Sequence, residues 1–489
     1  MQGARADRHE TGAIEMPEKP RQDPSPDRRG LSLWWDMLPE AAGVRPGLGG
    51  DLDVDVAIVG AGYTGLWTAR YLAIADPSLR MVVLEAEVAG YGASGRNGGW
   101  CSALFAASDT KLAREHGEDA ARRMRAEMVR TVEEVGRAAA AEGIDCHFAK
   151  GGTVVMARDP AQVTRAKMQV AEARSFGAGE ADLTWLDRRE AHERVGATRV
   201  LGATYTPHCA AIDPARLVRG LAEAVERLGV PVHEGTPVVA IRPGRNGRRP
   251  AAVTTRGTVR AEVVVRALEA WTATLPGERR TLAPVYSLML ATEPLDDAFW
   301  KEAGLAARET FSDQRHLVIY GQRTADGRVA FGGRGAPYHF GSRVRPGFDQ
   351  DARVHEGLRQ ALVDLFPALG DASITHRWGG PIGVPRDWHS SVGLDRATGV
   401  AWAGGYVGDG VSTANLAGRT LADLVRGERS DLVTLPWVGH RWPRWEPEPL
   451  RWLGVNAGLR GVELADRSEA RRGRPSWLAS KMSGMLGGR

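Results

Sequence analysis

Cysteine and long apolar runs are both scarce in this sequence. Only three of the 489 residues are cysteine (Cys101, Cys146 and Cys209), and no two of them form a CxxC pair. This spacing predicts neither a disulfide framework nor a zinc site, and we expect no metal. No stretch reaches the roughly 18 apolar residues of a membrane span, and the first thirty residues lack the apolar segment of a secretory signal. We therefore expect a cytoplasmic protein without a membrane span.

Lysine is also rare, so that arginine carries almost all of the basic charge. The net charge of +4 is small for 64 basic residues. A nucleic-acid-binding protein would need a basic stripe interleaved with aromatic residues in its folded body. We see no such stripe and predict no nucleic-acid partner. The lysines are Lys19, Lys111, Lys150, Lys167, Lys301 and Lys481.

The length of the chain exceeds what one hydrophobic core of ordinary size accommodates, so we expect two domains. The hydrophobic fraction of 43% and the charged fraction of 25% are ordinary for a globular protein. Residues 1–30 are rich in Pro, Asp and Arg, which predicts a disordered tail. The apolar segment Leu33-Trp34-Trp35 is expected to dock onto the folded body.

A β-turn-α unit begins near Val54. Residues 54–59 form a β-branched run that predicts a short strand, and Leu66, Ala69 and Leu72 follow at helical spacing. Residues 81–85 predict a second buried parallel strand that ends in a carboxylate. Together these segments predict a βαβ unit.

The rest of the chain alternates between two secondary-structure patterns. Residues 111–142 predict one long helix, with Met124, Met128, Val132 and Val135 on its buried stripe. Residues 284–334 read as turn-punctuated antiparallel strands, which indicates a second domain. Residues 400–425 return to a glycine-rich strand-turn-helix. The fold class is therefore α/β combined with α+β.

Three glycines occupy the positions of a G-x-G-x-x-G motif, directly after the first strand. The first glycine permits a tight turn, the second lets a pyrophosphate approach the backbone, and the third lets helix and strand pack closely. The helix N-terminus offers N–H groups to phosphates, and Glu85 would accept hydrogen bonds from ribose hydroxyls while disfavouring the 2′-phosphate of NADP. The alternative is a structural glycine-rich loop. The predicted contacts are Gly60, Ala61, Gly62, Tyr63, Thr64, Gly65, Glu85 and Ala86.

A second glycine-rich segment begins seven residues after Glu85. Its dense run of small residues would let the backbone lie against a flat ring, and its polar groups would donate to phosphate or ring atoms. An NAD dehydrogenase has no evident need for it, so the segment favours FAD. An ordinary flexible loop is the alternative. The predicted contacts are Gly92, Ala93, Ser94, Arg96, Asn97, Gly98 and Gly99.

A third glycine-rich turn precedes an apolar-periodic helix that runs through Leu424. Glycines and a helix N-terminus suit the electron-rich edge of a reduced flavin. Taken alone, the segment could be a simple turn and cap. The predicted contacts are Gly405, Gly408, Gly410, Val411 and Ser412.

The order GAGYTG, Glu85, GYGASGRNGG, Asp213-Pro214 and GGYVGDG resembles the glycine oxidase, sarcosine oxidase and D-amino-acid oxidase superfamily of FAD-dependent oxidoreductases. The GASGRNGG stretch is most similar to the γ-glutamylputrescine oxidoreductase branch. The resemblance implies a Rossmann-like FAD-binding domain of the GR2 type, interleaved with an antiparallel-sheet substrate domain. It also implies that Val238 meets the adenine. Arg96-Asn97 and Trp378-Gly379 stand where covalently attached flavins have histidine or cysteine, so FAD is expected to be non-covalent.

The resemblance divides the chain into seven segments. After the tail, FAD-binding segments are expected to alternate with substrate-domain segments. Residues 266–270, Arg-Ala-Leu-Glu-Ala, depart from the small residues usual at the strand exit beside the FAD phosphates. The segments are 1–30 (tail), 31–105, 205–270 and 393–430 (FAD-binding), 106–204 and 271–392 (substrate), and 431–489 (Trp/Arg-rich C-terminal extension).

The chemistry that the resemblance implies is oxidation of a carbon–nitrogen bond. Hydride passes from a small-molecule amine to flavin N5, the imine is hydrolysed, and oxygen or another acceptor reoxidises the flavin. Sarcosine oxidases carry lysines at positions that match Ser412 and the neighbourhood of Ala330 and Phe331. Because this chain has no lysine there, we expect a primary or secondary amine rather than an α-amino acid.

The candidate substrate-facing residues are aromatic or charged. Aromatic rings could surround an ammonium group, and a carboxylate could attract it. Core packing, a surface charge for Arg334 and a helix N-cap for Asp409 are the structural alternatives. An amino-acid oxidase, an NAD-dependent dehydrogenase and a non-catalytic FAD-binding protein remain alternative functions, and the oligomeric state stays open. The candidates are Tyr320, Arg334, Trp378, Tyr406 and Asp409.

Overall fold

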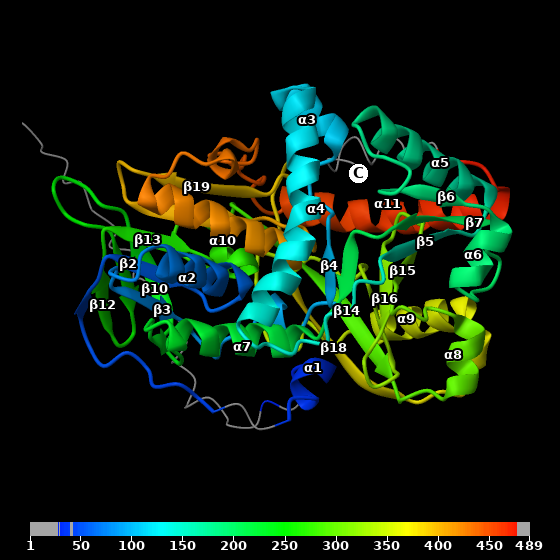
Figure 1. The fold of residues 1–489 in the computed structure, drawn as a ribbon, viewed down its shortest axis with the longest axis horizontal. Helices are drawn as coiled ribbons and strands as arrows, with labels where there is room; N and C mark the ends of the chain where they lie inside the picture. Colours follow the sequence, from blue (N-terminus) through cyan, green and yellow to red (C-terminus); the bar gives the residue numbers. More distant parts are fainter. Residues whose placement is uncertain (1–27, 29, 40–42, 477–489) are drawn as a thin grey trace, which may run out of the picture.

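The computed structural model describes residue 28, residues 30–39 and residues 43–476. Figure 1 shows two lobes, with a parallel sheet and its helices in one and a large antiparallel sheet in the other. The predicted disordered tail, residues 1–30, lies almost wholly outside the described residues. The observed architecture is the mixed α/β and α+β fold that the sequence predicts.

The first lobe is built on a six-stranded sheet in the order β19-β20-β13-β2-β3-β9. Five strands run parallel, and β19 pairs antiparallel at one edge. Every residue of β2 and β3 is buried, which explains their uninterrupted Val, Ile and Leu runs. The strands are β2 (Val56–Val59), β3 (Met81–Leu84), β9 (Val232–His233), β13 (Val263–Arg266), β19 (Ser391–Asp395) and β20 (Val400–Gly404).

The two faces of this sheet are covered by different elements. Val56 and Ile58 belong to the core shared with the helices, whereas Ala57 and Val59 belong to the core shared with a four-stranded sheet. This alternation follows from the two-residue period of a strand. The helices are α2 (Tyr63–Ala75), α7 (Pro214–Arg227) and α10 (Gly410–Arg426), and the small sheet holds β1 (Leu52–Asp53), β12 (Gly257–Arg260), β11 (Ala251–Thr254) and β10 (Val238–Arg242).

The second lobe is built on an eight-stranded sheet in the order β18-β14-β17-β16-β15-β5-β7-β6. Its pairings are antiparallel except β15 with β5. Strands from two separated stretches of the chain meet in it. They are β5 (Thr153–Ala157), β6 (Thr184–Leu186), β7 (Gly202–Thr206), β14 (Ala283–Thr292), β15 (Thr310–Asp313), β16 (Ile319–Arg323), β17 (Val329–Gly333) and β18 (Ile374–Val384).

Shorter helices and a small ribbon complete the lobes. Figure 1 shows α5, α6, α8 and α9 around the large sheet. A two-stranded ribbon, β4 with β8, follows the second glycine-rich segment. The bounds are α5 (Pro160–Ser175), α6 (Arg188–Arg194), α8 (Asp297–Ala303), α9 (Ala352–Leu365), β4 (Trp100–Ser102), β8 (Cys209–Ala211), and the 3-10 turns η1 (Ala93–Gly95), η2 (Glu269–Thr274), η3 (Pro367–Leu369) and η4 (Asp431–Thr434).

The prediction of one long helix over residues 111–142 is wrong. The chain forms α3 (Asp109–His116) and α4 (Glu118–Ala141), because Gly117 adopts φ +88° and breaks the helix. The predicted buried stripe on α4 is confirmed, with Met124 and Met128 fully buried. Figure 1 shows α4 standing between the two lobes.

The two ends of the described chain pack on the body. The predicted docking of Leu33-Trp34-Trp35 is confirmed, since these residues form α1 (Leu33–Asp36) and are buried. Near the C-terminus, α11 (Leu450–Arg472) crosses behind the second lobe in Figure 1. Residues 477–489 of the predicted extension lie outside the described residues.

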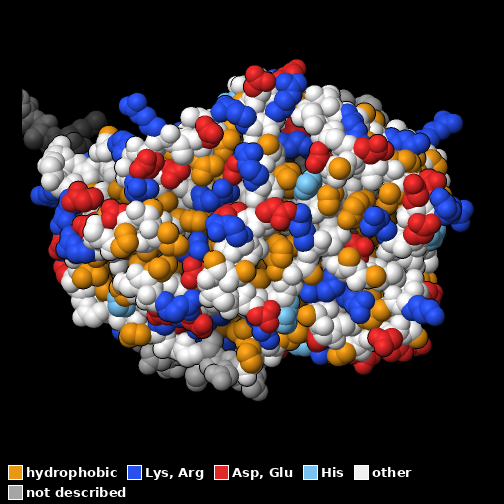
Figure 2. All heavy atoms as spheres, in the orientation of Figure 1, with side chains coloured by type: hydrophobic (Ala, Val, Ile, Leu, Met, Phe, Trp, Pro, Cys, Tyr) orange, Lys and Arg blue, Asp and Glu red, His pale blue; other side chains and the backbone are white. Residues whose placement is uncertain are grey.

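The surface mixes charges of both signs. On the face drawn in Figure 2, basic and acidic side chains are interspersed over both lobes. Within the described part of the chain, no helix is both long enough and apolar enough to span a membrane.

Candidate functional site

The first glycine motif fills the turn between β2 and α2. Gly60 has φ +107°, and a Cβ there would lie 2.5 Å from the carbonyl oxygen of Ala267. A Cβ on Gly65 would lie 1.9 Å from the carbonyl oxygen of Gly60. The motif therefore brings helix and strand closer than any larger residue permits, as predicted.

The N-terminus of α2 is open toward the second glycine segment. Gly62 is the N-cap and supplies no side-chain cap. The backbone N–H of Tyr63 donates to the hydroxyl of Ser94 at 2.9 Å. The first-turn N–H groups and the positive end of the helix therefore face the segment 92–99, as an anion-binding site requires.

Glu85 directly follows β3 and reaches back to the glycine turn. Its carboxylate accepts from the N–H of Ala61 at 2.8 Å and from the N–H of Glu87 at 3.0 Å. Burial raises the pKa of Glu85 to about 7, against the lowering effect of these two hydrogen bonds. Each oxygen keeps a further lone pair for a hydroxyl donor. This geometry suits a contact between Glu85 and a ribose, which stays a prediction. The next residue, Ala86, is exposed, and its predicted cofactor contact also stays a prediction.

Side chains from distant elements hold the segment 92–99. Four consecutive carbonyl groups in it each accept a side-chain hydrogen bond. The segment is therefore a fixed platform rather than the flexible loop kept as an alternative. The pairs are Ser32 Oγ to Gly95 O at 2.8 Å, Trp378 Nε1 to Arg96 O at 2.8 Å, Trp34 Nε1 to Asn97 O at 2.8 Å, and Gln322 Nε2 to Gly98 O at 2.7 Å.

The polar side chains of this segment are already engaged within the protein. Arg96 donates to the carbonyl of Tyr91 at 2.8 Å and lies 3.2 Å from a carboxylate oxygen of Asp349. Asn97 donates to the carbonyl of Ala93 at 3.0 Å and accepts from the N–H of Gly99. These contacts give both side chains a role in shaping the segment, and their contact with a cofactor stays a prediction.

The third glycine segment joins β20 to α10. Asp409 occupies the N-cap position, but its side chain makes no capping bond. The hydroxyl of Tyr406 lies 2.8 Å from that of Thr64, and Ser412 donates to the carbonyl of Ser102 in β4. The three glycine segments therefore lie together, with a second uncapped helix N-terminus beside the first.

Glu269 is a site residue that the sequence flagged only as a departure from the usual small residues. Its carboxylate accepts from the N–H of Gly405 at 3.1 Å and of Tyr406 at 3.2 Å. Burial raises the pKa of Glu269 to about 7, opposed by these backbone donors. Its φ of +46° is unusual for a residue other than glycine. The sequence signal that could have identified Glu269 is an acidic residue shortly after a buried strand, where the family usually has small residues.

The aromatic candidates divide into two groups. Tyr320 packs on the second segment, since a Cβ on Gly98 would lie 2.5 Å from its ring, and its hydroxyl bonds that of Ser287. Trp378 is 1% exposed, and its indole N–H donates to the carbonyl oxygen of Arg96. Trp378 therefore fits the packing alternative, whereas Tyr320 lies beside the site.

Arg334 follows β17 and points at the third segment. Its guanidinium donates to the carbonyl of Val407 at 2.7 Å and lies 5.5 Å from the ring of Trp388. Burial lowers its pKa. Among the described residues, no acidic side chain forms an ion pair with Arg334. Partly buried and in contact with the third segment, Arg334 does not fit the paired surface charge kept as an alternative, and its contact with a substrate stays a prediction.

Val238 begins β10, where the register with β11 shifts, and its adenine contact stays a prediction. Cys101 is fully buried in β4, and burial raises the pKa of its thiol well above the ordinary range.

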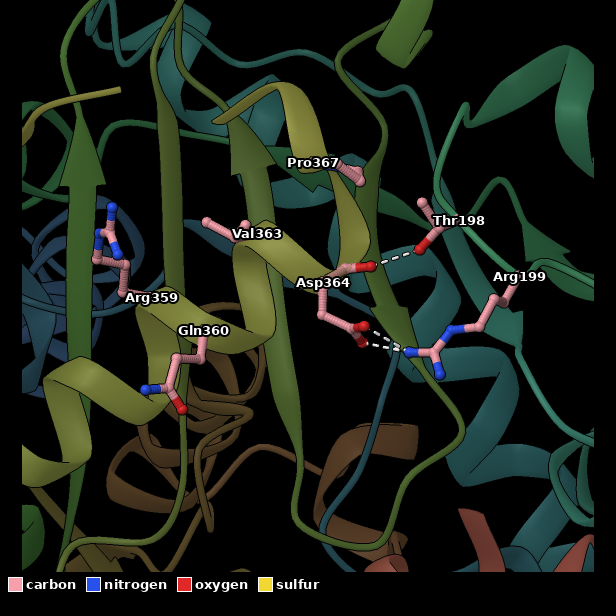
Figure 3. A pocket seen from close by; sticks show the side chains of 7 residues that line it. All are labelled: Thr198, Arg199, Arg359, Gln360, Val363, Asp364 and Pro367. Carbon is pink, nitrogen blue, oxygen red and sulfur yellow. Dashed lines mark hydrogen bonds and ion pairs between the residues drawn. The ribbon is translucent and has the colours of Figure 1, made fainter. Parts of the chain in front are cut away.

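A cavity of about 480 Å³ lies elsewhere, between α9 and the loop before β7 (Figure 3). Its guanidinium groups already have partners. Arg199 pairs with Asp364 at 2.5 Å, and Arg359 donates to the carbonyl of Gly370. This cavity is separate from the glycine segments.

These features define a Rossmann-type dinucleotide-binding protein: a parallel sheet, a glycine turn, a helix N-terminus without a side-chain cap, and an acidic residue at a strand end. The comparisons with known proteins make the class specific. The sequence model described as FAD dependent oxidoreductase (DAO) matches residues 55–424. The chain belongs to this family of FAD-dependent oxidoreductases.

Relatives and solved structures agree with this membership. A probable oxidoreductase OrdL of Rhizobium meliloti is 31% identical over 421 residues, covering 84% of this chain and 92% of the relative. Gamma-glutamylputrescine oxidoreductase of Escherichia coli is 31% identical over 378 residues, covering 76% and 84%. Glycine oxidase from Geobacillus kaustophilus shares the fold, with a TM-score of 0.64 at 24% identity over 80% of this chain and 99% of that chain.

The residues present fit FAD. The two uncapped helix N-termini suit electron-rich groups, the turn at Gly60 and Gly65 leaves no room for a Cβ, and Glu85 retains acceptor capacity. The first turn of α2 would hold the pyrophosphate, Glu85 the ribose, and the second and third segments the ring system.

Proposed function

We propose that this protein oxidises the carbon–nitrogen bond of a primary or secondary amine that also carries a carboxylate. The observation that supports the proposal most directly is Arg334, a partly buried guanidinium beside the third glycine segment without an acidic partner among the described residues. Burial lowers its pKa, and arginines removed from water ordinarily have an anionic partner. A substrate carboxylate would supply it.

The name of one relative supports this substrate class. The Escherichia coli protein is named gamma-glutamylputrescine oxidoreductase, and a γ-glutamyl group joined to an amine retains a carboxylate. The proposal takes from this name only the combination of amine and carboxylate.

Bound FAD, held non-covalently, would accept the hydride that leaves the carbon next to the substrate nitrogen. The chain binds and orients the amine for that transfer. Arg334 would fix the carboxylate by charge-assisted hydrogen bonds. Tyr320 lines the neighbouring wall with its hydroxyl held by Ser287 at 2.8 Å. Asp409 would attract the ammonium form, which releases one proton to solvent water before hydride transfer. Water then hydrolyses the imine to a carbonyl compound and ammonia or a smaller amine.

An α-amino acid oxidase is the second candidate, and Arg334 would suit it too. The positions of the family lysines argue for the amine. Ser412 is buried and bonded to Ser102, while Ala330 and Phe331 are fully buried in β17. None of the three can offer a cation to an α-carboxylate. The electron acceptor, oxygen or another oxidant, is left open by these contacts.

The test is an anaerobic screen of the FAD-loaded protein for flavin bleaching. Carboxylate-bearing amines, neutral amines and α-amino acids are compared, and air is then admitted with peroxide detection. We expect carboxylate-bearing amines to bleach the flavin fastest. Fastest bleaching by α-amino acids would refute the amine assignment, and an amine-independent yellow protein would refute catalysis.

Variants of Arg334 test the carboxylate contact. Arg334→Met should lower kcat/KM for a carboxylate-bearing amine by about 100-fold, which corresponds to about 3 kcal/mol. It should change neutral amines little. Arg323→Met is the matched control. Arg323 also lies over a tryptophan, at 4.4 Å from the ring of Trp300, but it is the last residue of β16 and does not contact the third glycine segment in any described interaction. Equal losses for both amine classes would contradict a specific carboxylate contact.

A further inference from the structure

A cluster of metal-ligand side chains lies where α3 ends. Glu115 and His116 close this helix, and His389 comes from the loop before β19. One ligand atom from each residue lies within 4.8 Å of the other two. The cluster joins segments that are more than 270 residues apart in sequence, and neither the glycine motifs nor the proposed catalysis uses it.

His389 has the geometry of a prepared metal ligand. It is 0% exposed, and its Nδ1 lies 2.6 Å from the carbonyl oxygen of Ser390. A carbonyl only accepts, so Nδ1 carries the proton and Nε2 presents a lone pair. Nε2 is buried and has no hydrogen-bond partner. Metal-binding histidines ordinarily donate their other N–H to a carbonyl or carboxylate in this way.

The neighbouring charged groups already have partners of their own. His440 stacks on His389 at 4.2 Å and bonds the carboxylate of Asp387 at 2.7 Å. Lys111 donates to the carbonyl of Asp387. Within the part of the chain that the structure describes, Glu115 pairs only with Arg114, at 3.4 Å on the surface, and a cation would displace this contact.

We propose that Glu115, His116 and His389 bind a divalent transition-metal ion of the zinc class, with water completing the coordination. Two imidazoles and a carboxylate form a ligand set that Zn²⁺ accepts, with the fourth position open. The exposed side chains of Glu115 and His116 provide the entry path.

A second cluster of similar composition shows why the choice falls here. His316, Asp466 and Glu469 also bring their ligand atoms together. There, Arg165 donates to Glu469, and Asp466 accepts from the backbone N–H groups of His316 and Leu317. A guanidinium and backbone donors therefore already occupy the positions that a cation would need.

The bound ion would tie α3 to the wall of the flavin site. In the loop that carries His389, Trp388 lies beneath Arg334, and Ser390 donates to the carbonyl of Gly405 at 3.1 Å. The carbonyl of His389 itself accepts from the indole of Trp442 at 2.8 Å. The ion is thus expected to stabilise this loop without taking part in hydride transfer.

The test uses the FAD-loaded protein without a polyhistidine tag. It is stripped with chelator, dialysed against Zn²⁺, desalted and analysed for metal by mass spectrometry, with calorimetric titration by Zn²⁺ alongside. We expect about one zinc ion per chain and a higher Tm with zinc. The variant Glu115→Ala/His116→Ala should weaken zinc binding by about 100-fold or more and abolish the Tm increase.

The matched control is His192→Ala/Glu193→Ala, because these exposed residues also adjoin each other near the end of a helix, α6, outside any such cluster among the described residues. His389→Ala should likewise lose zinc. If His389→Ala fails to fold, the surface variant alone decides. A wild-type protein that binds no zinc, or a Glu115→Ala/His116→Ala variant that keeps it, would overturn the proposal. Loss of zinc in His316→Ala with retention in His389→Ala would do the same.

Discussion

Gln322→Leu is the sharpest test of the platform formed by residues 92–99. Gln322 is fully buried, and its amide N–H₂ group donates to the carbonyls of Gly98 at 2.7 Å and Ile212 at 3.2 Å. Its own Oε1 has no partner. Leucine has a similar volume but cannot donate, so two buried carbonyls would lose their partners.

The expected cost follows from these contacts. Each buried carbonyl left unpaired costs about 1–3 kcal/mol, and removing the unpaired Oε1 returns part of this sum. We therefore expect the free energy of unfolding to fall by about 3 kcal/mol. If FAD binding must restore the platform, FAD affinity falls by up to about 100-fold.

Chemical denaturation and FAD titration of the apoprotein measure the two effects. Gln162→Leu is the matched control. Gln162 is also a buried glutamine, but it accepts a single hydrogen bond, from the N–H of Arg158 at 2.9 Å, in the second lobe. The control should lose about 1 kcal/mol and keep its FAD affinity. Wild-type FAD affinity and stability in Gln322→Leu would refute the reasoning.

Two further predictions concern the other glycine segments. Because burial raises the pKa of Glu269 to about 7, the folded chain holds a proton that the unfolded chain releases above its ordinary value of 4.5. As the pH rises from 4.5 to 7, the free energy of unfolding of the wild type should therefore fall by up to about 3 kcal/mol relative to that of Glu269→Gln, in addition to any pH-independent difference between the two proteins. Denaturation curves across this pH range measure the change. A difference that does not vary with pH would contradict the assignment. Gly65→Ala should abolish FAD retention, seen as a colourless purified protein, because its Cβ would meet the carbonyl oxygen of Gly60. The control is Gly454→Ala, where a Cβ would lie in open space on α11. This variant should remain yellow, and its free energy of unfolding should rise by about 1 kcal/mol.

Local sequence signals were sufficient for the nucleotide-binding half of the fold. The strand at 54–59, the glycine turn and the apolar run at 81–85 each lie within a few residues, and the structure places them as predicted. The helix break at Gly117 is not evident from the sequence, because the predicted stripe from Met124 to Val135 lies wholly beyond it and an isolated glycine does not by itself mark a helix end.

The side chains that support the site could not be predicted, because their partners are distant in sequence. Trp34 and Gln322 bind carbonyls of the same short segment from elements 63 and 224 residues away. The sequence shows a tryptophan after a disordered-looking tail and a glutamine in a strand. Nothing local says which backbone oxygen each one satisfies. Arg334 is a similar case, since only the fold shows that no acidic side chain among the described residues forms an ion pair with it.

The loop from Asp387 to Ser390 links the two proposals physically while keeping their tests separate. Trp388 adopts φ +56°, a conformation that a bulky residue holds only when its surroundings determine it. One determinant is the guanidinium of Arg334 over its ring, and the other is the burial of His389. A zinc ion on His389 would therefore restrict the tryptophan beneath the proposed carboxylate contact. Since that contact uses the guanidinium itself, Arg334→Met should leave zinc binding intact, and loss of the zinc ligands should leave the substrate preference intact while altering the stability of the loop.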